Sequence, residues 1–421
     1  MCGCSVAAVS VRTSLAPFRR PKLRRLLFAQ LVADLGDGMV TVALPLYVYK
    51  LTGSASATSA TFVGEVVVGV LLSVIGGSLA DSRDRRLVLV VSDVIRAVLL
   101  VAVASFTAVG VVLTFGIAAR AMGMLDNPSF DALVPGLADG DLQQVVGARR
   151  LTQSVSILLG PAVGGIAVSI VGARATLGGA SVLYVIAMIW IAGMRDLDPT
   201  VGERRAARSG EGFAATLTNA FEGLRVIRRT PFAVRLLSYW ALSMTTVAMV
   251  MIAAIVWFVR DLHVSGAWYG VSIAAYGSGS LLGLLWAGGR TFRLELPALL
   301  LLAVPLYAAC AALAVAWHTP WLMLVSWFGW GVAMGPEIVV GETRLVELIP
   351  EAARGRVSAA QAIITQLGLA LGYGLAGPLV DRYGARTTNL MAALGTLATI
   401  GFWVGPFRHD RRVADRSAAR T

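Results

Sequence analysis

The sequence predicts an all-α integral membrane protein with twelve transmembrane helices arranged as two six-helix bundles. Hydrophobic residues make up 57% of the 421 residues, charged residues only 14%, and the mean hydropathy is +0.75. An ordinary soluble chain has about a quarter of its residues charged. The apolar residues also gather in windows of roughly 20, the length that an α-helix needs to cross about 30 Å of hydrocarbon.

Twelve such windows follow one another along the chain. They lie near residues 26–49, 56–80, 87–109, 111–133, 150–172, 175–194, 233–258, 268–289, 296–316, 319–341, 357–380 and 387–405. A charged segment separates the first six from the last six, which predicts an N-terminal bundle over 26–194 and a C-terminal bundle over 233–405. Residues 1–25 and 406–421 are predicted to be tails.

The segment between the bundles, 195–232, is predicted to be a linker on the cytoplasmic side. In its second part, apolar residues recur every three or four positions, at Phe213, Leu217, Phe221, Leu224 and Ile227. This spacing gives a helix one apolar face and suits a helix that lies on the membrane surface. For residues 196–211 a solvated charged loop is nearly as good an interpretation.

The net charge of +12 reports the topology of the chain. If both termini are cytoplasmic, 28 of the 36 Lys and Arg residues lie in inside segments and only five in outside loops. Such an excess is typical of cytoplasmic loops in membrane proteins, where it also meets anionic lipid headgroups. We therefore expect a multi-pass protein of the inner (plasma) membrane with both termini inside. A nucleic-acid partner is not expected.

An intramembrane enzyme and an ATP-driven pump are both disfavoured. The three histidines, His263, His318 and His409, all fall in predicted loops or the tail, so a buried general base or metal ligand is lacking. The only lysines, Lys22 and Lys50, belong to no phosphate-binding loop. We expect no metal site and no cofactor.

Weak internal similarity indicates that the two bundles arose by duplication. GPAVGGIAVSIVGARATL at 160–177 aligns with GYGLAGPLVDRYGARTTNL at 372–390 at an offset of 212 residues. Internal repeats of this kind are common in secondary transporters. Both segments fall at the outer end of the fifth of six spans.

The loop between the second and third spans reads GGSLADSRDRR at 76–86 and holds Gly77, Asp81, Arg85 and Arg86. Glycine allows two helices to approach closely, and an aspartate accepts hydrogen bonds from amides at a helix end. An ordinary positively charged loop would explain the arginines but not the Gly-x-x-x-Asp pattern.

This loop resembles the one that marks the major facilitator superfamily, Gly-x-x-x-Asp-Arg/Lys-x-Gly-Arg/Lys-Arg/Lys, with Ser82 and Asp84 as departures. The resemblance implies a cytoplasmic lock that holds the two halves together when the protein faces outward. The similar stretch GPLVDRYGAR at 377–386 is predicted to lie outside, and we interpret it as a coincidental likeness. The second-half counterpart of the lock is Gly283-x-x-x-Ala287, where the Asp has been lost.

The fifth span resembles the glycine pattern of antiporters in that superfamily. It carries Gly147, Ser156, Gly160, Pro161, Gly164 and Gly165 at the family's spacings, with Ser156 in place of a glycine. Glycines remove side-chain bulk so that helices pack tightly, and the proline bends the helix. The resemblance implies export, although a glycine-rich packing face is common in any membrane helix.

Further segments are similar to the macrolide-efflux and enterobactin-exporter branch of the superfamily. They are LFAQLVADLGDGMVTVALPLYVYKLTGSASA in the first span, SDVIRA in the third, DNPSFDALVP closing the fourth and FEGLRVIRRTPF before the seventh. The similarity runs over the whole chain, though each piece is short.

Ionisable residues within the spans are costly and usually functional. We predict that a carboxylate among them carries a proton, with Asp34 or Asp37 as the first choice and Glu65 and Arg120 as modulators. Asp93 and Arg96 share a face of the third span and are predicted to be a buried charge pair, with a purely structural role as the alternative. Asp37 capping a glycine-induced break is also possible. The second half contributes the candidate Glu337.

Aromatic residues within the second half are candidates for lining a cavity that holds a large apolar compound. They are Trp240, Tyr276, Tyr307, Trp327, Trp330 and Tyr373. Packing against lipid is the alternative for each of them.

Taken with the resemblance, these features predict a proton-coupled exporter of lipophilic small molecules, such as an antibiotic, a secondary metabolite or a siderophore. We expect its partners to be the substrate, protons and the lipid bilayer, and the protein to be a monomer. The alternatives are an uptake symporter or lipid transporter on the same fold, and less favourably an intramembrane enzyme or a scaffold.

Overall fold

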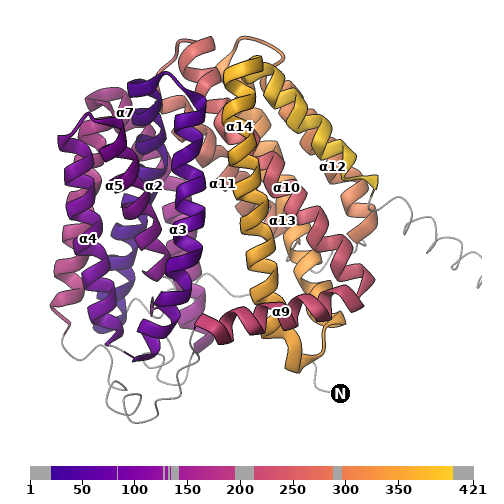
Figure 1. Ribbon diagram of the computed structural model, residues 1–421, viewed down its shortest axis with the longest axis horizontal. Helices are drawn as coiled ribbons and strands as arrows, with labels where there is room; N and C mark the ends of the chain where they lie inside the picture. The colour runs from indigo at the N-terminus through magenta and orange to yellow at the C-terminus, as the bar shows by residue number, and fades with distance from the viewer. Residues whose placement is uncertain are drawn as a thin grey trace, which may run out of the picture.

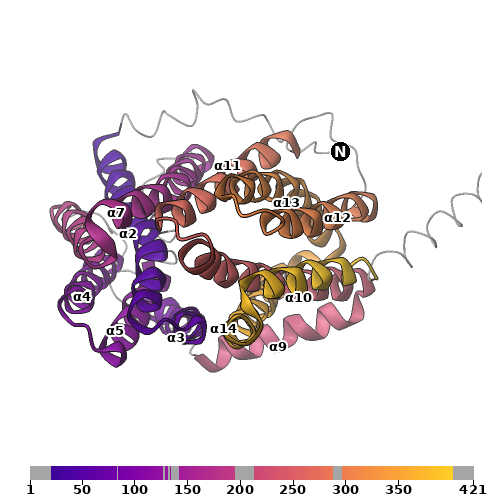
Figure 2. The same ribbon diagram turned by 90° about the horizontal axis from the view of Figure 1, so that it is seen from above.

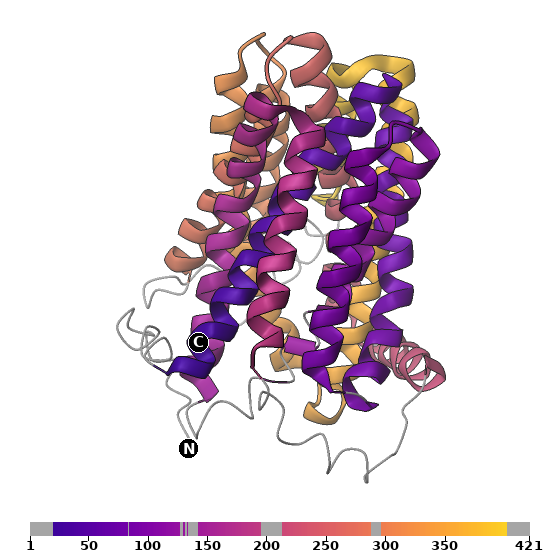
Figure 3. The ribbon, with the colours of Figure 1, turned by 90° about the vertical axis from the view of Figure 1, so that its left-hand side faces the viewer.

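The computed structural model describes residues 20–82, 84–126, 129–130, 133, 142–194, 213–287 and 296–401. Over these residues the chain is helical and contains no strand. Figure 1 shows two groups of helices side by side, the first half of the chain in one and the second half in the other. Figures 1 and 3 show the long helices running roughly parallel from one end of the molecule to the other. The predicted all-α membrane fold is confirmed.

The helices of the first half are α2 (Pro21–Thr52), α3 (Ala55–Ser82), α4 (Arg85–Ser105), α5 (Val109–Met122) with a 3₁₀ turn at Gly123–Leu125, and α7 (Leu142–Ala192). Those of the second half are α10 (Pro231–Val256) with a π turn at Trp257–Asp261, α11 (Ala267–Ala287), α12 (Leu296–Ala314), α13 (Pro320–Leu348), a 3₁₀ turn at Glu351–Ala353, and α14 (Arg354–Ala398). Proline stands in the first turn of α2, α10 and α13, where its missing amide costs no helical hydrogen bond.

Two of these helices, α7 and α14, contain a kink at a glycine. Gly172 and Gly384 have φ angles of 83° and 84°, in the left-handed region that favours glycine. They are corresponding residues of the internal repeat. Over the described residues, nine helices are long and apolar enough to cross a membrane, and Val109–Leu125 is a shorter apolar helix. Twelve spans are reached only if the shorter helix is counted and α7 and α14 are each divided at the kink. The count of twelve therefore stays a prediction.

The helix α9 (Phe213–Arg229) lies across one end of the molecule, nearly at right angles to the others (Figure 1). It occupies the second part of the predicted linker. Gly223 packs directly on the backbone of Arg356, and the Glu222 carboxylate pairs with the Arg356 guanidinium at 2.5 Å. We call this the inner end of the molecule, and the opposite end, which holds Gly53, Gly172 and Gly384, the outer end.

The two halves meet along two seams. Figure 2 shows α7 beside α11 at one seam and α3 beside α14 at the other. At the first seam, a Cβ added to Gly270 would lie 2.2 Å from the Pro161 carbonyl oxygen. At the second, a Cβ added to Gly377 would lie 2.6 Å from the Ser56 Cα. The small residues at both seams are therefore required for the backbones to approach this closely.

Candidate functional site

A cavity of about 570 Å³ lies against the first seam and is formed mainly by the first half of the chain. Its charged and polar lining comes from α2, α3, α5 and α7, whereas α11 contributes Ile273. The lining residues are Asp34, Asp37, Gly38, Thr41, Glu65, Arg120, Gly123, Met124, Gln153, Ser156, Ile157, Pro161 and Ile273. The structure thus brings together four of the predicted coupling residues, Asp34, Asp37, Glu65 and Arg120.

Asp34 is held by two side chains. Its Oδ2 lies 2.8 Å from Nη1 of Arg149, and its Oδ1 accepts a hydrogen bond of 2.8 Å from the Gln30 amide. The Arg149 guanidinium also stacks over the ring of Phe130, 4.5 Å from its centroid. Sequence reasoning missed Arg149 because an arginine at the inner end of a span reads as a headgroup anchor.

Asp37 and Glu65 are linked through Arg120. The Arg120 guanidinium lies 2.7 Å from Glu65 and 3.9 Å from the Asp37 carboxylate, and it also donates a hydrogen bond of 3.2 Å to the Asp37 carbonyl. Asp37 further accepts from the Tyr184 hydroxyl at 2.9 Å and from the Arg96 guanidinium. A change in the charge of Asp37 would therefore be felt by both arginines.

Arg96 is the centre of a larger network than the predicted pair with Asp93. Its Nη1 lies 2.6 Å from Asp126 but 4.0 Å from Asp93, and its Nη2 donates to Asp37 and to the Tyr184 hydroxyl. The Arg96 side chain is only 1% exposed. The predicted pair of Asp93 and Arg96 is present, at 4.0 Å and with both side chains buried, but the carboxylates of Asp37 and Asp126 lie closer to the guanidinium. Asp126 is the first residue of the segment DNPSFDALVP, which carries a family resemblance but no other sign of a buried charge.

Three carboxylates, those of Asp34, Asp37 and Glu65, and one guanidinium, that of Arg120, line the cavity, whereas Arg96 and Arg149 do not. The Asp37 side chain is 34% exposed and lines the cavity, whereas Arg96, at 1%, lies behind it. Asp34 likewise lines the cavity, with the less exposed Arg149 behind it. Three carboxylates, those of Asp37, Asp93 and Asp126, face the single guanidinium of Arg96, so uptake of a proton by the cluster reduces its excess of negative charge.

Glu337 lies in the second half, away from this network, and does not line the cavity. It is 3% exposed on α13 and accepts hydrogen bonds from the Tyr307 hydroxyl at 2.7 Å, the Tyr239 hydroxyl at 2.8 Å and the Trp240 indole at 3.1 Å. A carboxylate with three neutral donors is well solvated by the protein. Its predicted part in proton coupling stays a prediction.

The glycine pattern of the fifth span packs α7 on two neighbours. Added Cβ atoms at Gly160 and Gly164 would lie 2.9 Å from the Cα of Gly38 and 2.7 Å from that of Met39, both on α2. One at Gly165 would lie 2.9 Å from the Ala267 carbonyl oxygen on α11. Ser156 is buried and donates a hydrogen bond to a backbone carbonyl within α7, which also contains Gly147. This pattern therefore joins α2 in the first half to α11 in the second.

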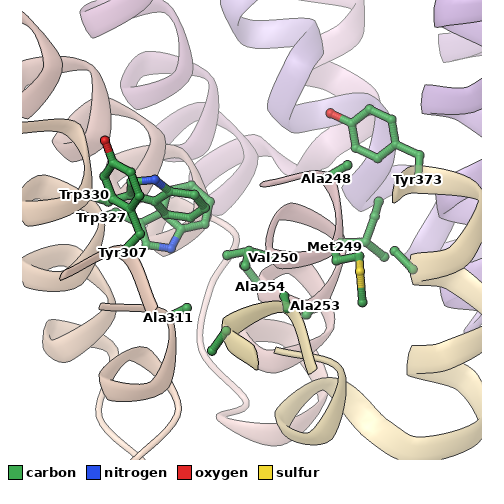
Figure 4. Packing of buried hydrophobic residues seen from close by; sticks show 14 of the residues in the cluster. Ala248, Met249, Val250, Ala253, Ala254, Tyr307, Ala311, Trp327, Trp330 and Tyr373 are labelled. Atoms are coloured by element: carbon green, nitrogen blue, oxygen red, sulfur yellow. The ribbon is translucent and has the colours of Figure 1, made fainter. Parts of the chain in front are cut away.

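The predicted aromatic residues of the second half do not line the described cavity. Tyr307, Trp327 and Trp330 lie together in the packed core of that half, as Figure 4 shows. Tyr276 contacts the Trp330 ring edge-on, and the Trp240 indole donates a hydrogen bond to Glu337. Their predicted role in lining a substrate cavity remains a prediction.

Tyr373 lies apart from the other aromatic residues, on the α14 side of Figure 4. Its ring stacks on that of Phe62, with centroids 4.7 Å apart, which places it at the seam between α3 and α14. Of the six aromatic candidates, this one joins the two halves.

The predicted cytoplasmic lock is described only in part. Gly77 and Asp81 fall in the last turns of α3, and their side chains lie outside the described part of the structure. Asp84 caps α4 by accepting from the Arg86 amide at 2.9 Å. The Arg86 guanidinium donates to the carbonyls of Ile191 and Ala192 at the end of α7. Arg86, and with it the start of α4 that includes Arg85, is thus joined to the last span of its own half.

Comparisons with known proteins agree with this architecture. The family model of the Major Facilitator Superfamily matches residues 26–372 and 236–420. The multidrug efflux pump Tap of Mycobacterium tuberculosis is 25% identical over 386 residues, which cover 89% of this chain and 90% of that protein. Tap of Mycolicibacterium fortuitum is 26% identical over 395 residues, covering 90% and 94%.

Solved structures share the fold at low identity. The nucleoside transporter NupG superposes with a TM-score of 0.75 at 15% identity, covering 92% of this chain and 99% of that one. A POT family transporter in complex with 5-aminolevulinic acid gives 0.67 at 12% identity, covering 93% and 96%. The family model, which matches most of the chain, and the efflux relatives indicate a transporter and not an enzyme. This chain is a multi-pass membrane transporter that belongs to the Major Facilitator Superfamily.

Proposed function

We propose that the protein exports lipophilic small molecules across the cell membrane in exchange for protons, with both termini in the cytoplasm. The observation that carries the proposal is the cavity beside the first seam, in which the carboxylates of Asp34, Asp37 and Glu65 are each paired with an arginine. The multidrug efflux relatives support export. The nucleoside and peptide transporters among the solved structures support only the fold.

The transport cycle follows from competition between protons and arginines for the same carboxylates. A proton that binds Asp37 weakens its bonds with Arg96 and Arg120, because a neutral carboxyl group attracts a guanidinium less than a carboxylate does. These residues lie on α2, α4 and α5, so their separation loosens the packing of the first half near the cavity. Alternating access then carries the proton inward while the substrate leaves in the other direction.

Removing a single carboxylate tests the coupling. In inverted membrane vesicles with an imposed pH gradient, we expect Asp34→Asn and Asp37→Asn each to lower gradient-driven transport of a panel of lipophilic compounds by roughly tenfold or more, because an amide does not exchange protons. Substrate-induced proton movement is followed with a pH-sensitive dye. Glu347→Gln serves as the control, since Glu347 is exposed and pairs with Arg344 one turn away.

Two outcomes contradict different parts of the proposal. If both variants transport and exchange protons like the unchanged protein, these carboxylates are not the coupling site. If the substrate instead leaves the inverted vesicles together with the protons, the protein is a symporter, which is the alternative stated from the sequence. Size-exclusion profiles of each variant show whether the fold is retained.

The charge arrangement of the cavity also predicts which compounds compete for it. The lining holds the three carboxylates of Asp34, Asp37 and Glu65 but only one guanidinium, that of Arg120, while Arg96 and Arg149 lie behind it. We therefore expect a lipophilic cation such as ethidium to inhibit transport at a concentration roughly tenfold lower than an anion of similar size such as anilinonaphthalenesulfonate, because the anion would be placed beside like charges. Equal inhibition by both dyes would contradict this prediction.

A further inference from the structure

The stretch at 377–386, which repeats the Gly-x-x-x-Asp pattern of the predicted lock, makes a specific contact between the two halves. Gly377 and Asp381 lie on α14, at the outer end of the second seam. The sequence alone predicts only a coincidental likeness to that lock. The structure places the stretch on the first turn of α3, which belongs to the opposite half.

Asp381 accepts three hydrogen bonds from this first turn. Its Oδ1 accepts from the Ala55 amide at 2.8 Å, and its Oδ2 accepts from the Ser56 amide at 2.9 Å and from the Ser54 hydroxyl at 3.0 Å. The first amides of a helix have no partner within the helix and carry partial positive charge. A carboxylate from another helix is a well-matched acceptor for them.

Contacts one and two turns along α14 extend the same seam. A Cβ added to Gly377 would meet the Ser56 Cα at 2.6 Å, so only glycine allows the helices to lie this close. The Ser59 hydroxyl donates to the Tyr373 carbonyl, and the Tyr373 ring stacks on Phe62. Residues 373, 377 and 381, spaced four apart on one face of α14, therefore all rest on α3.

The contact is built so that it can be released. The Ser54 hydroxyl oxygen also accepts a hydrogen bond of 3.2 Å from the Ala57 amide, so α3 has a capping residue of its own. When Asp381 withdraws, α3 keeps this cap and its first two amides turn to water. Loss of the contact therefore separates the halves without unravelling a helix.

We propose that Asp381 is a reversible lock that holds the outer ends of the two halves together while the cavity is accessible from the inner end. Opening to the outside breaks the three hydrogen bonds and the Gly377 contact. The proposal rests on alternating access but not on the direction of transport or on proton coupling. Asp381 is thus a positioning residue of the transport cycle that acts on the seam and not on the substrate.

Accessibility of a cysteine in the cavity tests the lock directly. In a full-length protein whose native cysteines have been replaced, Thr41→Cys places a thiol in the cavity lining. A membrane-impermeant maleimide is added from outside, and we expect Asp381→Ala to raise the rate at which this thiol is labelled about tenfold. This is the effect of losing a charge-assisted contact that stabilises only the state closed to the outside. Asp381→Glu, which keeps a carboxylate, should restore much of the low rate.

A matched control and a second variant keep the test decisive. Asp261→Asn removes a carboxylate from the outer end that pairs with the adjacent Arg260 within the same half, and it should leave labelling unchanged. Gly377→Ala should raise labelling with Asp381 intact, because its Cβ forces the helices apart. The proposal is overturned if Asp381→Ala and Gly377→Ala, both shown to be folded by size exclusion, label at the original rate, or if Asp261→Asn has the same effect as Asp381→Ala. Because no transport is measured, a failure of the exporter proposal leaves this result interpretable.

Discussion

Replacement of Arg96 by leucine is expected to cost about 3–5 kcal/mol of stability, the range for breaking a buried ion pair by removing one partner. The Arg96 guanidinium is 1% exposed and contacts Asp37, Asp126 and the Tyr184 hydroxyl, with Asp93 at 4.0 Å. Its loss leaves Asp93 and Asp126, both almost fully buried, without a cation among the described contacts. The measurement is the thermal unfolding of purified protein in detergent, with the yield of monodisperse protein as a second readout.

The origin of this loss is tested by neutralising the carboxylates as well. Arg96→Leu combined with Asp93→Asn and Asp126→Asn should recover much of the stability, since removing both signs of charge avoids an uncompensated buried ion. Arg235→Leu is the control, because Arg235 also lies within a predicted span but its side chain is exposed. If Arg96→Leu unfolds no earlier than Arg235→Leu, the network contributes no net stability.

The fold class and the charged residues within the spans could be predicted from the sequence. Apolar windows and the distribution of arginines do not depend on how the helices pack, so they can be read one segment at a time. The carboxylates Asp34, Asp37 and Glu65 were conspicuous because each interrupts an apolar run. The structure places all three in the lining of one cavity.

The partners of these carboxylates could not be predicted because they come from other helices. Arg149 stands at the end of a predicted span, where charged residues ordinarily reach the membrane surface, and Asp126 lies within another, 111–133. Nothing in their local sequence distinguishes an outward-pointing side chain from one that turns inward to meet Asp34 or Arg96. Such pairings are decided by tertiary packing.

The aromatic candidates show a second limit. An aromatic residue in an apolar window fits lipid, a packed core or a cavity equally well, and Trp327 and Tyr307 belong to the core of their half. The stretch around Asp381 shows a third limit. Its place beside the kink at Gly384 agrees with the predicted turn between the last two spans, whereas its contact with α3 could not be predicted. The role of a Gly-x-x-x-Asp pattern depends on which helix packs against it, and the local sequence does not specify that helix.

Replacement of Glu337 by leucine is the second change with a large expected effect. The Tyr307 hydroxyl and the Trp240 indole would lose the acceptor that Glu337 provides in a buried site, and the Tyr239 hydroxyl would lose one of its hydrogen bonds. A buried donor left without a partner costs about 1–3 kcal/mol, and we expect a net loss near the upper end of that range for the group, since some donors will find other acceptors. Glu347→Leu, on the exposed face of the same helix, should unfold like the unchanged protein.

Glutamine at position 337 separates a structural role from a role in coupling. The amide keeps an oxygen that accepts hydrogen bonds but does not exchange a proton, so Glu337→Gln is expected to unfold within about 1 kcal/mol of the unchanged protein. If Glu337 takes part in coupling, this well-folded variant will lose the dependence of transport on the pH gradient. If it retains that dependence while Glu337→Leu is destabilised, Glu337 only organises the core of the second half, and coupling belongs to the first half. That outcome would fit the structure, in which the cavity is lined by Asp34, Asp37 and Glu65 while Glu337 lies apart from it.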